Sequence, residues 1–153
     1  MNLNKKRQTH RGCDFWLFQG LGWLLFFYLL YAQVVSAFSY DLGVSMGTQE
    51  PAEIISEVGV AFWKGFAVSD LIYVPLLGVG LLGQLQSPVR GKIIFAAALG
   101  ITIYWPIVSL VAVYVARNAD GWNLQGEFAY WIVLPVIALW GFWGMLRLHR
   151  ESS

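Results

Sequence analysis

Four long apolar stretches constrain the fold of this chain more than any other feature of its sequence. They run over residues 15–38, 57–83, 93–116 and 128–146. Each meets or approaches the roughly 20 residues that an α-helix needs to cross about 30 Å of hydrocarbon. The stretches therefore predict four transmembrane helices.

The composition supports a membrane environment. Of the 153 residues, 58% are hydrophobic and 12% are charged, whereas soluble domains are about half apolar and about a quarter charged. A chain of this length cannot bury so much apolar surface in one water-soluble core. We predict an all-α integral membrane protein with one four-span domain. The connections are short apart from residues 39–56, which favours an antiparallel four-helix transmembrane bundle.

The basic residues predict the orientation of this bundle. With four spans, the two tails and the second connection fall on one side, and they hold Lys5, Lys6, Arg7, Arg11, Arg90, Lys92, Arg147 and Arg150. The opposite side holds Arg117 and several acids. Because basic residues mark the cytoplasmic side, both termini are predicted to be cytoplasmic, with residues 39–56 as an outer loop. The expected location is the inner (plasma) membrane of a bacterium.

The start of the chain has a competing interpretation as a signal peptide. A basic stretch precedes the first apolar run, and small residues precede Phe38. The apolar run is longer than the roughly 7 to 15 residues of a signal-peptide core. We therefore expect an uncleaved first helix.

Two ionisable residues, Lys64 and Asp70, fall inside the second apolar stretch. Asp70 is near its middle, and Lys64 is about 9 Å closer to the outer side at 1.5 Å per residue. An ionised aspartate at mid-membrane costs at least a few kcal/mol, so Asp70 should be neutral, paired or in contact with water. The two side chains point about 120° apart around the helix, with Ala67 midway between them. We predict one broad face, centred on Ala67, that presents both groups to an internal cavity.

Polar residues of the other spans lie at comparable depths. Tyr104 is level with Asp70, and the outer halves of the other spans contribute an amide and two hydroxyls. The predicted ligand-binding residues of an outward-facing pocket are Lys64, Asp70, Tyr104, Gln33, Ser109 and Tyr130. In this pocket Lys64 would meet an anionic group, and Asp70 and Tyr104 would form a polar floor. The structural alternative is that each hydroxyl or amide bonds a neighbouring backbone carbonyl.

A stripe of small residues recurs every four positions on the second stretch: Ala61, Gly65 and Ser69. Small residues let helix backbones approach closely in lipid. We predict that this stripe is a helix-packing surface.

Several classes of function lack the residues that they need. The two histidines lie outside the spans and cannot hold haem between helices, and one cysteine cannot form a Cys-x-x-Cys pair. No phosphate loop, zinc-ligand spacing or catalytic triad is present. We therefore predict no cofactor, no metal and no nucleic-acid partner. An enzyme is the least supported class.

Three functions remain from different classes. The first is a small membrane protein that binds a lipid-like or amphiphilic molecule in an outward-facing intramembrane pocket. The second is a proton-coupled small transporter, working as a homo-oligomer, in which Asp70 titrates. The third is a structural subunit whose small-residue stripe docks a larger membrane partner. Membrane lipids are expected partners in all three.

Overall fold

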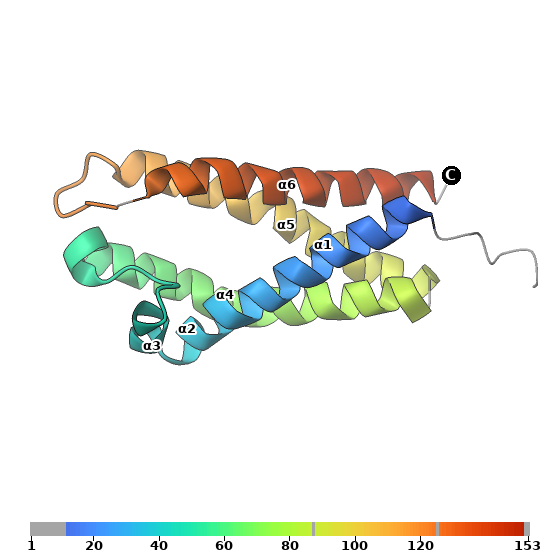
Figure 1. Ribbon diagram of the computed structural model, residues 1–153, viewed down its shortest axis with the longest axis horizontal. Helices are drawn as coiled ribbons and strands as arrows, with labels where there is room; N and C mark the ends of the chain where they lie inside the picture. The colour runs from blue at the N-terminus through green and yellow to red at the C-terminus, as the bar shows by residue number, and fades with distance from the viewer. Residues whose placement is uncertain (1–11, 87, 125, 152–153) are drawn as a thin grey trace, which may run out of the picture.

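The structure, a computed structural model, describes residues 12–86, 88–124 and 126–151. Within these ranges the chain is helical and contains no strand. The segments are α1 (Cys13–Leu29), the π-helical η2 (Leu30–Val34), α2 (Val35–Phe38), α3 (Tyr40–Ser45), α4 (Ala52–Gln86), α5 (Pro88–Ala116) and α6 (Glu127–Arg150), as Figure 1 shows. The basic residues Lys5, Lys6, Arg7 and Arg11 lie outside the described residues.

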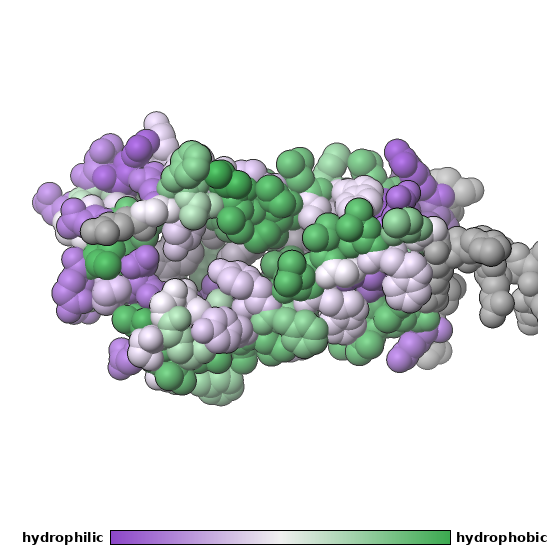
Figure 2. All heavy atoms as spheres, viewed as in Figure 1, coloured by the Kyte–Doolittle hydropathy of each residue, from purple (hydrophilic) through white to green (hydrophobic). Residues whose placement is uncertain are grey.

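The four predicted spans are confirmed as helices that are long and apolar enough to cross a membrane. The candidate spans are Cys13–Phe38, Ala52–Gln86, Gly91–Ala116 and Glu127–Arg150. Each contains the apolar stretch that the sequence predicted. Exposed apolar side chains cover the middle of the face seen in Figure 2, and hydrophilic side chains gather at its two ends. This distribution matches a protein surrounded by lipid at its waist.

The bundle has two distinct ends. The terminal end contains Cys13 and Arg150, and there Arg147 donates a hydrogen bond to the Asp14 carbonyl oxygen at 2.9 Å. The loop end contains α3 and residues 117–124. At the loop end the Asn123 amide donates to the Ile54 carbonyl oxygen at 2.6 Å. This bond joins the connection between α5 and α6 to the beginning of α4.

The helices α4 and α5 form the closest pair. A Cβ added to Gly83 would lie 2.6 Å from the Gly91 Cα, so the two backbones touch there without side chains between them. Further along, the hydroxyls of Tyr73 and Thr102 are 2.6 Å apart. Residues of α4 closer to the loop end therefore lie beside residues of α5 closer to the loop end. These two contacts show which residues of the two helices lie at the same level.

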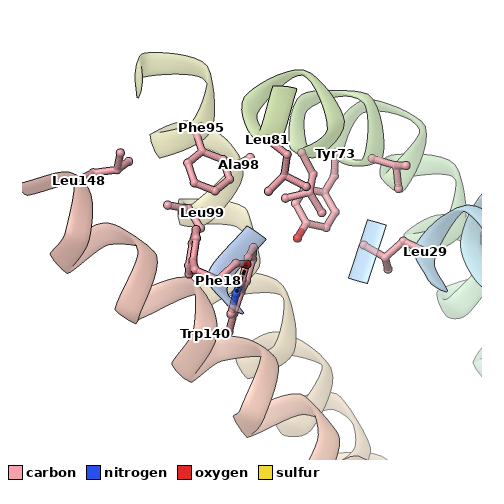
Figure 3. Packing of buried hydrophobic residues seen from close by; sticks show 11 residues of the cluster. Phe18, Leu29, Tyr73, Leu81, Phe95, Ala98, Leu99, Trp140 and Leu148 are labelled. Carbon is pink, nitrogen blue, oxygen red and sulfur yellow. Dashed lines mark hydrogen bonds between the residues drawn. The ribbon is translucent and has the colours of Figure 1, made fainter. Parts of the chain in front are cut away.

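The helix α1 crosses the bundle obliquely (Figure 1). Near the terminal end Phe18 stacks on Trp140 of α6, with ring centroids 4.8 Å apart, and the Trp140 indole donates to the Phe18 carbonyl oxygen at 3.3 Å. Figure 3 shows these two rings side by side. Toward the loop end, η2 and α2 lie against α4 instead. The crossing therefore separates α1 from α6 in the half of the bundle nearer the loop end.

Two clusters of buried side chains hold the helices together. The larger, toward the terminal end, includes Phe18, Tyr73, Leu81, Phe95 and Trp140 (Figure 3). The smaller, at the loop end, is built on Tyr40, Ile55, Trp63 and Val113. The α4 residues between the clusters include Ala67 and Asp70, both buried.

The predicted packing stripe does not touch another helix of this chain. Ala61, Gly65 and Ser69 are exposed, and a Cβ added to Gly65 would meet no atom within 4 Å. Ser69 satisfies its hydroxyl on its own helix, at the Phe66 carbonyl oxygen 2.8 Å away. Close helix contacts use glycines further along α4 instead, at Gly78, Gly80 and Gly83. As a contact within the chain, the predicted stripe is therefore wrong.

The segment 39–56 is more helical than expected. Ser39 caps α3 by accepting a hydrogen bond from the Leu42 amide at 3.3 Å. The helix α4 begins at Ala52, directly after Pro51, but its backbone breaks at Ser56, where φ is 65° and ψ is 165°. A positive φ is unfavourable for serine. The Ser56 hydroxyl accepts from the Gly59 amide at 3.4 Å and so begins the long straight part of α4.

Candidate functional site

A cavity of about 430 Å³ lies in the half of the bundle nearer the loop end. Its walls come from α1, η2, α4, α5, α6 and the segment 46–50. The volume falls within the roughly 300–1,000 Å³ typical of small-molecule sites. It occupies the space that opens where α1 leaves α6, and Figure 2 shows the molecule hollowed there. The fold therefore provides one site large enough for an organic molecule.

The mouth of this cavity is at the side of the bundle. Tyr28 and Tyr31 line it, lie within the first candidate span and are 52% and 50% exposed. Val133 lines the opposite wall from the first third of α6 and is also half exposed. By contrast, Trp63 and Trp105 on the inner wall are almost fully buried. The cavity opens between α1 and α6, at a surface that faces lipid if the four helices span a membrane.

The structure brings together three of the six predicted site residues. Gln33, Ser109 and Tyr130 line the cavity from three different helical segments. Gln33 belongs to η2, and π-helical turns within α-helices occur frequently at functional sites. The Ser109 hydroxyl is buried and has no hydrogen-bond partner among the described residues. These three groups are available to a ligand.

Lys64 and Asp70 do not share a cavity, so that prediction is wrong. Asp70 is 2% exposed and faces the interior of the bundle, whereas Lys64 is exposed on the outer surface of α4. Buried α4 positions follow the sequence Trp63, Ala67, Asp70, Val74, and Lys64 falls beside this row. The face centred on Ala67 is buried as expected, but it is too narrow to include Lys64.

Tyr104 also lies elsewhere than expected. It is 69% exposed on the outside of α5 and cannot bond Asp70 across the bundle. The buried polar residue of this turn is Thr102, whose hydroxyl contacts the Tyr73 hydroxyl and donates to the Ala98 carbonyl oxygen at 2.8 Å. Tyr104 lies near the middle of α5, but its side chain points away from the interior of the bundle.

A carboxyl without a partner remains at mid-bundle. The Asp70 Oδ2 atom is buried and accepts no hydrogen bond from the described residues. Asp70 lies three residues before Tyr73 on α4, and Trp105 lies three residues after Thr102 on α5, in both cases toward the loop end. Because the Tyr73 and Thr102 hydroxyls are in contact, Asp70 and Trp105 lie at the same level of the bundle. The Trp105 indole nitrogen is likewise buried and without a partner in the described part of the chain. Of the two, only Trp105 lines the cavity.

Five aromatic side chains dominate the cavity wall: Tyr28, Tyr31, Trp63, Trp105 and Tyr130. The rings of Trp63 and Tyr130 lie with centroids 6.1 Å apart and planes at 39°. The sequence prediction named Tyr130 as the one aromatic residue of this wall. It missed Trp63 and Trp105 as site residues, although Trp63 stands one helical turn before Ala67 on the predicted inward face.

The cavity is polar at one end and apolar at the other. Thr48, Gln49 and Glu50 line it at the loop end. Further along α6 its wall consists of Val133, Leu134 and Ile137. Tyr130 and Ile137 are separated by seven residues, or about 10 Å along the helix axis. This gradient runs from the loop end toward the middle of the bundle.

The segment 46–50 is held over the cavity by hydrogen bonds. Thr48 donates through its hydroxyl to the Gly43 carbonyl oxygen at 3.0 Å, and the Gln49 side chain donates to the Ala32 carbonyl oxygen at 3.4 Å. Gly43 has no room for a side chain, because a Cβ there would run into the Ser36 hydroxyl. The close approach of α3 to α2 therefore depends on this glycine.

Tyr40 holds Glu50 in place at the polar end of the cavity. Its hydroxyl donates to the Glu50 carbonyl oxygen at 3.0 Å. Burial raises the pKa of Tyr40 to about 12, and the nearby Tyr130 and Glu50 add to this increase. Tyr40 therefore keeps its proton, and the hydrogen bond, throughout the physiological pH range. The sequence prediction did not include Glu50 among the pocket residues.

Comparison with protein-family models, with curated proteins and with solved structures finds no match to this chain. Among the described residues no group of three His, Cys, Asp or Glu side chains is arranged to hold a metal ion. The arguments for function therefore come from the cavity and from the mid-bundle carboxyl.

Proposed function

We propose that the protein binds a lipid-like or amphiphilic small molecule in the cavity between α1 and α6. The observation that carries this proposal is the polarity gradient of the cavity together with its opening at the side of the bundle. The loop-end wall offers hydroxyl, amide and carboxylate groups to a head group. The wall further along α6 offers aliphatic side chains to a chain of methylene groups, whose burial is worth about 0.8 kcal/mol each.

In this proposal the four helices form an antiparallel transmembrane bundle with the terminal end in the cytoplasm. The described residues of the terminal end include Lys92, Arg147 and Arg150, whereas the loop end carries mostly acids. The positive-inside tendency favours this orientation. The cavity then lies in the outer half of a bacterial inner membrane, with its mouth toward the outer leaflet.

Binding can be tested with a substitution whose larger side chain occupies part of the cavity. Ser109→Leu adds volume at a buried position of the wall, and Ser69→Leu adds the same volume at an exposed position of α4. Lipids that co-purify with each variant are extracted and quantified by mass spectrometry. We expect an amphiphile present in wild type and in Ser69→Leu to be depleted in Ser109→Leu. Equal lipid profiles in all three proteins would contradict the proposal.

Proton-coupled transport is the second candidate function, and one observation favours it. The Asp70 carboxyl is buried at mid-bundle without a hydrogen-bond partner among the described residues. Ionisable residues inside membrane spans are costly and commonly serve ion or proton pathways. Asp70 lies level with Trp105 of the cavity wall, so a ligand in the cavity and a proton on Asp70 would lie within one helical turn of each other.

A further inference from the structure

We infer that the cavity recognises the ammonium group of a cationic amphiphile, an inference that rests on the proposed function and names the chemistry of its ligand. The charge of the cavity wall favours a cationic ligand. Among the lining residues that the structure describes, Glu50 is charged and none is Lys, Arg or His. The sequence-based expectation of an anionic head group depended on Lys64, which faces away from the cavity. An anion would meet the Glu50 carboxylate without a compensating positive charge.

The aromatic side chains of the cavity wall also favour a cation. A cation is attracted to the face of Trp, Tyr or Phe within about 6 Å of the ring centroid, and groups of such rings recognise quaternary ammonium ions. Trp63 and Tyr130 stand 6.1 Å apart and tilted toward each other by 39° at the loop end of the cavity. Glu50 lines the same end. Two rings and the side chain of Glu50 thus line the end of the cavity where the head group of an amphiphile would sit.

The position of Glu50 supports a binding role for its carboxylate. Tyr40 holds the Glu50 backbone at the cavity rim, and the side chain forms no ion pair with any described basic residue. The neighbouring acid Glu53 is exposed and does not line the cavity. The two glutamates therefore differ in position but not in chemistry, which makes Glu53 a matched control.

The charge of the loop end acts in the same direction. Its acids are Asp41, Glu50, Glu53, Glu57, Asp120 and Glu127, against the single base Arg117 in residues 39–57 and 117–127. Arg117 lies 3.9 Å from Glu127 and is partly neutralised there. A surface with an excess of one charge raises the local concentration of ions of the opposite charge. Cations are therefore attracted to the end of the bundle at which the polar part of the cavity lies.

The test uses amphiphiles that share one chain and differ in head group. The full-length protein in maltoside micelles is titrated by calorimetry with octyltrimethylammonium, octanoate and octyl glucoside, and separately with tetramethylammonium, which has no chain. We expect octyltrimethylammonium to bind at least about tenfold more tightly than octanoate, because both the rings and the carboxylate favour a cation. Glu50→Gln should weaken octyltrimethylammonium binding about fivefold, and Glu53→Gln should leave it unchanged.

The outcomes separate this inference from the proposed function. If all three octyl compounds bind equally and Glu50→Gln has no effect, the ammonium inference is overturned and the amphiphile site stands. If no octyl compound binds, both are overturned. If tetramethylammonium binds as tightly as octyltrimethylammonium, the octyl chain contributes nothing; the cavity then binds a free cation, and both the amphiphile proposal and the cationic-amphiphile inference are overturned. Thermal unfolding of each variant in the same micelles verifies that it is folded.

Discussion

The Tyr40 hydroxyl donates a hydrogen bond to the backbone carbonyl of Glu50, 3.0 Å away, and so ties α3 to the rim of the cavity. Tyr40→Phe removes this bond and leaves the ring in place. Because a hydrogen bond of this kind contributes about 1 kcal/mol, we expect a loss of that size in the free energy of unfolding, measured by thermal or chemical denaturation in detergent. Tyr104→Phe, at an exposed position, is the control and should change stability little.

The same tyrosine predicts how stability depends on alkaline pH. Burial raises the pKa of Tyr40 from its ordinary value of 10.0 to about 12 in the folded protein. Between these values the unfolded chain loses the proton while the folded chain keeps it, so the stabilisation present below pH 10 is lost as the pH rises toward 12. Thermal unfolding at intervals across this range should show a decline that is shallower in Tyr40→Phe. Identical slopes would contradict the burial of the hydroxyl.

Helix packing predicts that leucine lowers the unfolding temperature at one glycine of α4 and not at another. Gly83 lies against the Gly91 backbone, whereas a side chain at Gly65 meets open space. Overpacking a close contact costs about 1–3 kcal/mol or more, so Gly83→Leu should lower the unfolding temperature strongly and Gly65→Leu should not. A large effect of Gly65→Leu would mean that a second molecule covers this face of α4. Cross-linking of the wild-type protein before unfolding distinguishes that case.

The spans were predictable because length and apolar content are sufficient to identify a helix that crosses lipid. The side of each helix that faces the interior of the bundle was not predictable. In water the buried face of a helix is apolar and the exposed face is polar, but lipid is as apolar as a protein core. The sequence around Lys64, Gly65 and Tyr104 therefore offers no contrast that marks these residues as outward-facing.

The candidate site was partly predictable for a related reason. Gln33, Ser109 and Tyr130 were selected by depth, and depth follows from counting residues along a helix. Glu50 and the segment around it reach the cavity through the turn after α3 and the close contact at Gly43. A tertiary contact of this kind leaves no periodic pattern in the sequence, so the residue that carries the charge of the cavity was missed.

The proposed orientation predicts which cysteines react from outside the cell. In a Cys13→Ser background, Ser45→Cys places a thiol at the exposed end of α3, and Ser153→Cys places one at the end of the chain. A membrane-impermeant maleimide should label Ser45→Cys in intact cells and Ser153→Cys only after the membrane is permeabilised. Labelling of both positions in intact cells would contradict the odd number of spans, three, that lie between them in this arrangement. The reverse pattern would place the terminal end outside.

The mid-bundle polar residues predict two contrasting substitutions. Thr102→Val removes the partner of the buried Tyr73 hydroxyl, and an unpaired buried group costs about 1–3 kcal/mol. Asp70→Leu removes a carboxyl oxygen that has no partner among the described residues. We therefore expect Thr102→Val to lower the free energy of unfolding by that amount and Asp70→Leu to preserve or increase it.

A third variant, Asp70→Asn, tests the function of the Asp70 carboxyl together with this pair. A carboxyl retained without a structural partner should be needed for activity, so Asp70→Asn, which keeps the shape of the side chain, should fold normally and lose any proton-coupled uptake in proteoliposomes. Ligand binding in the cavity should survive, because Asp70 does not line it. If Asp70→Leu is instead less stable than Thr102→Val, the carboxyl has a stabilising partner such as buried water. Its place in the bundle would then be structural, and the transport candidate would lose the observation that favours it.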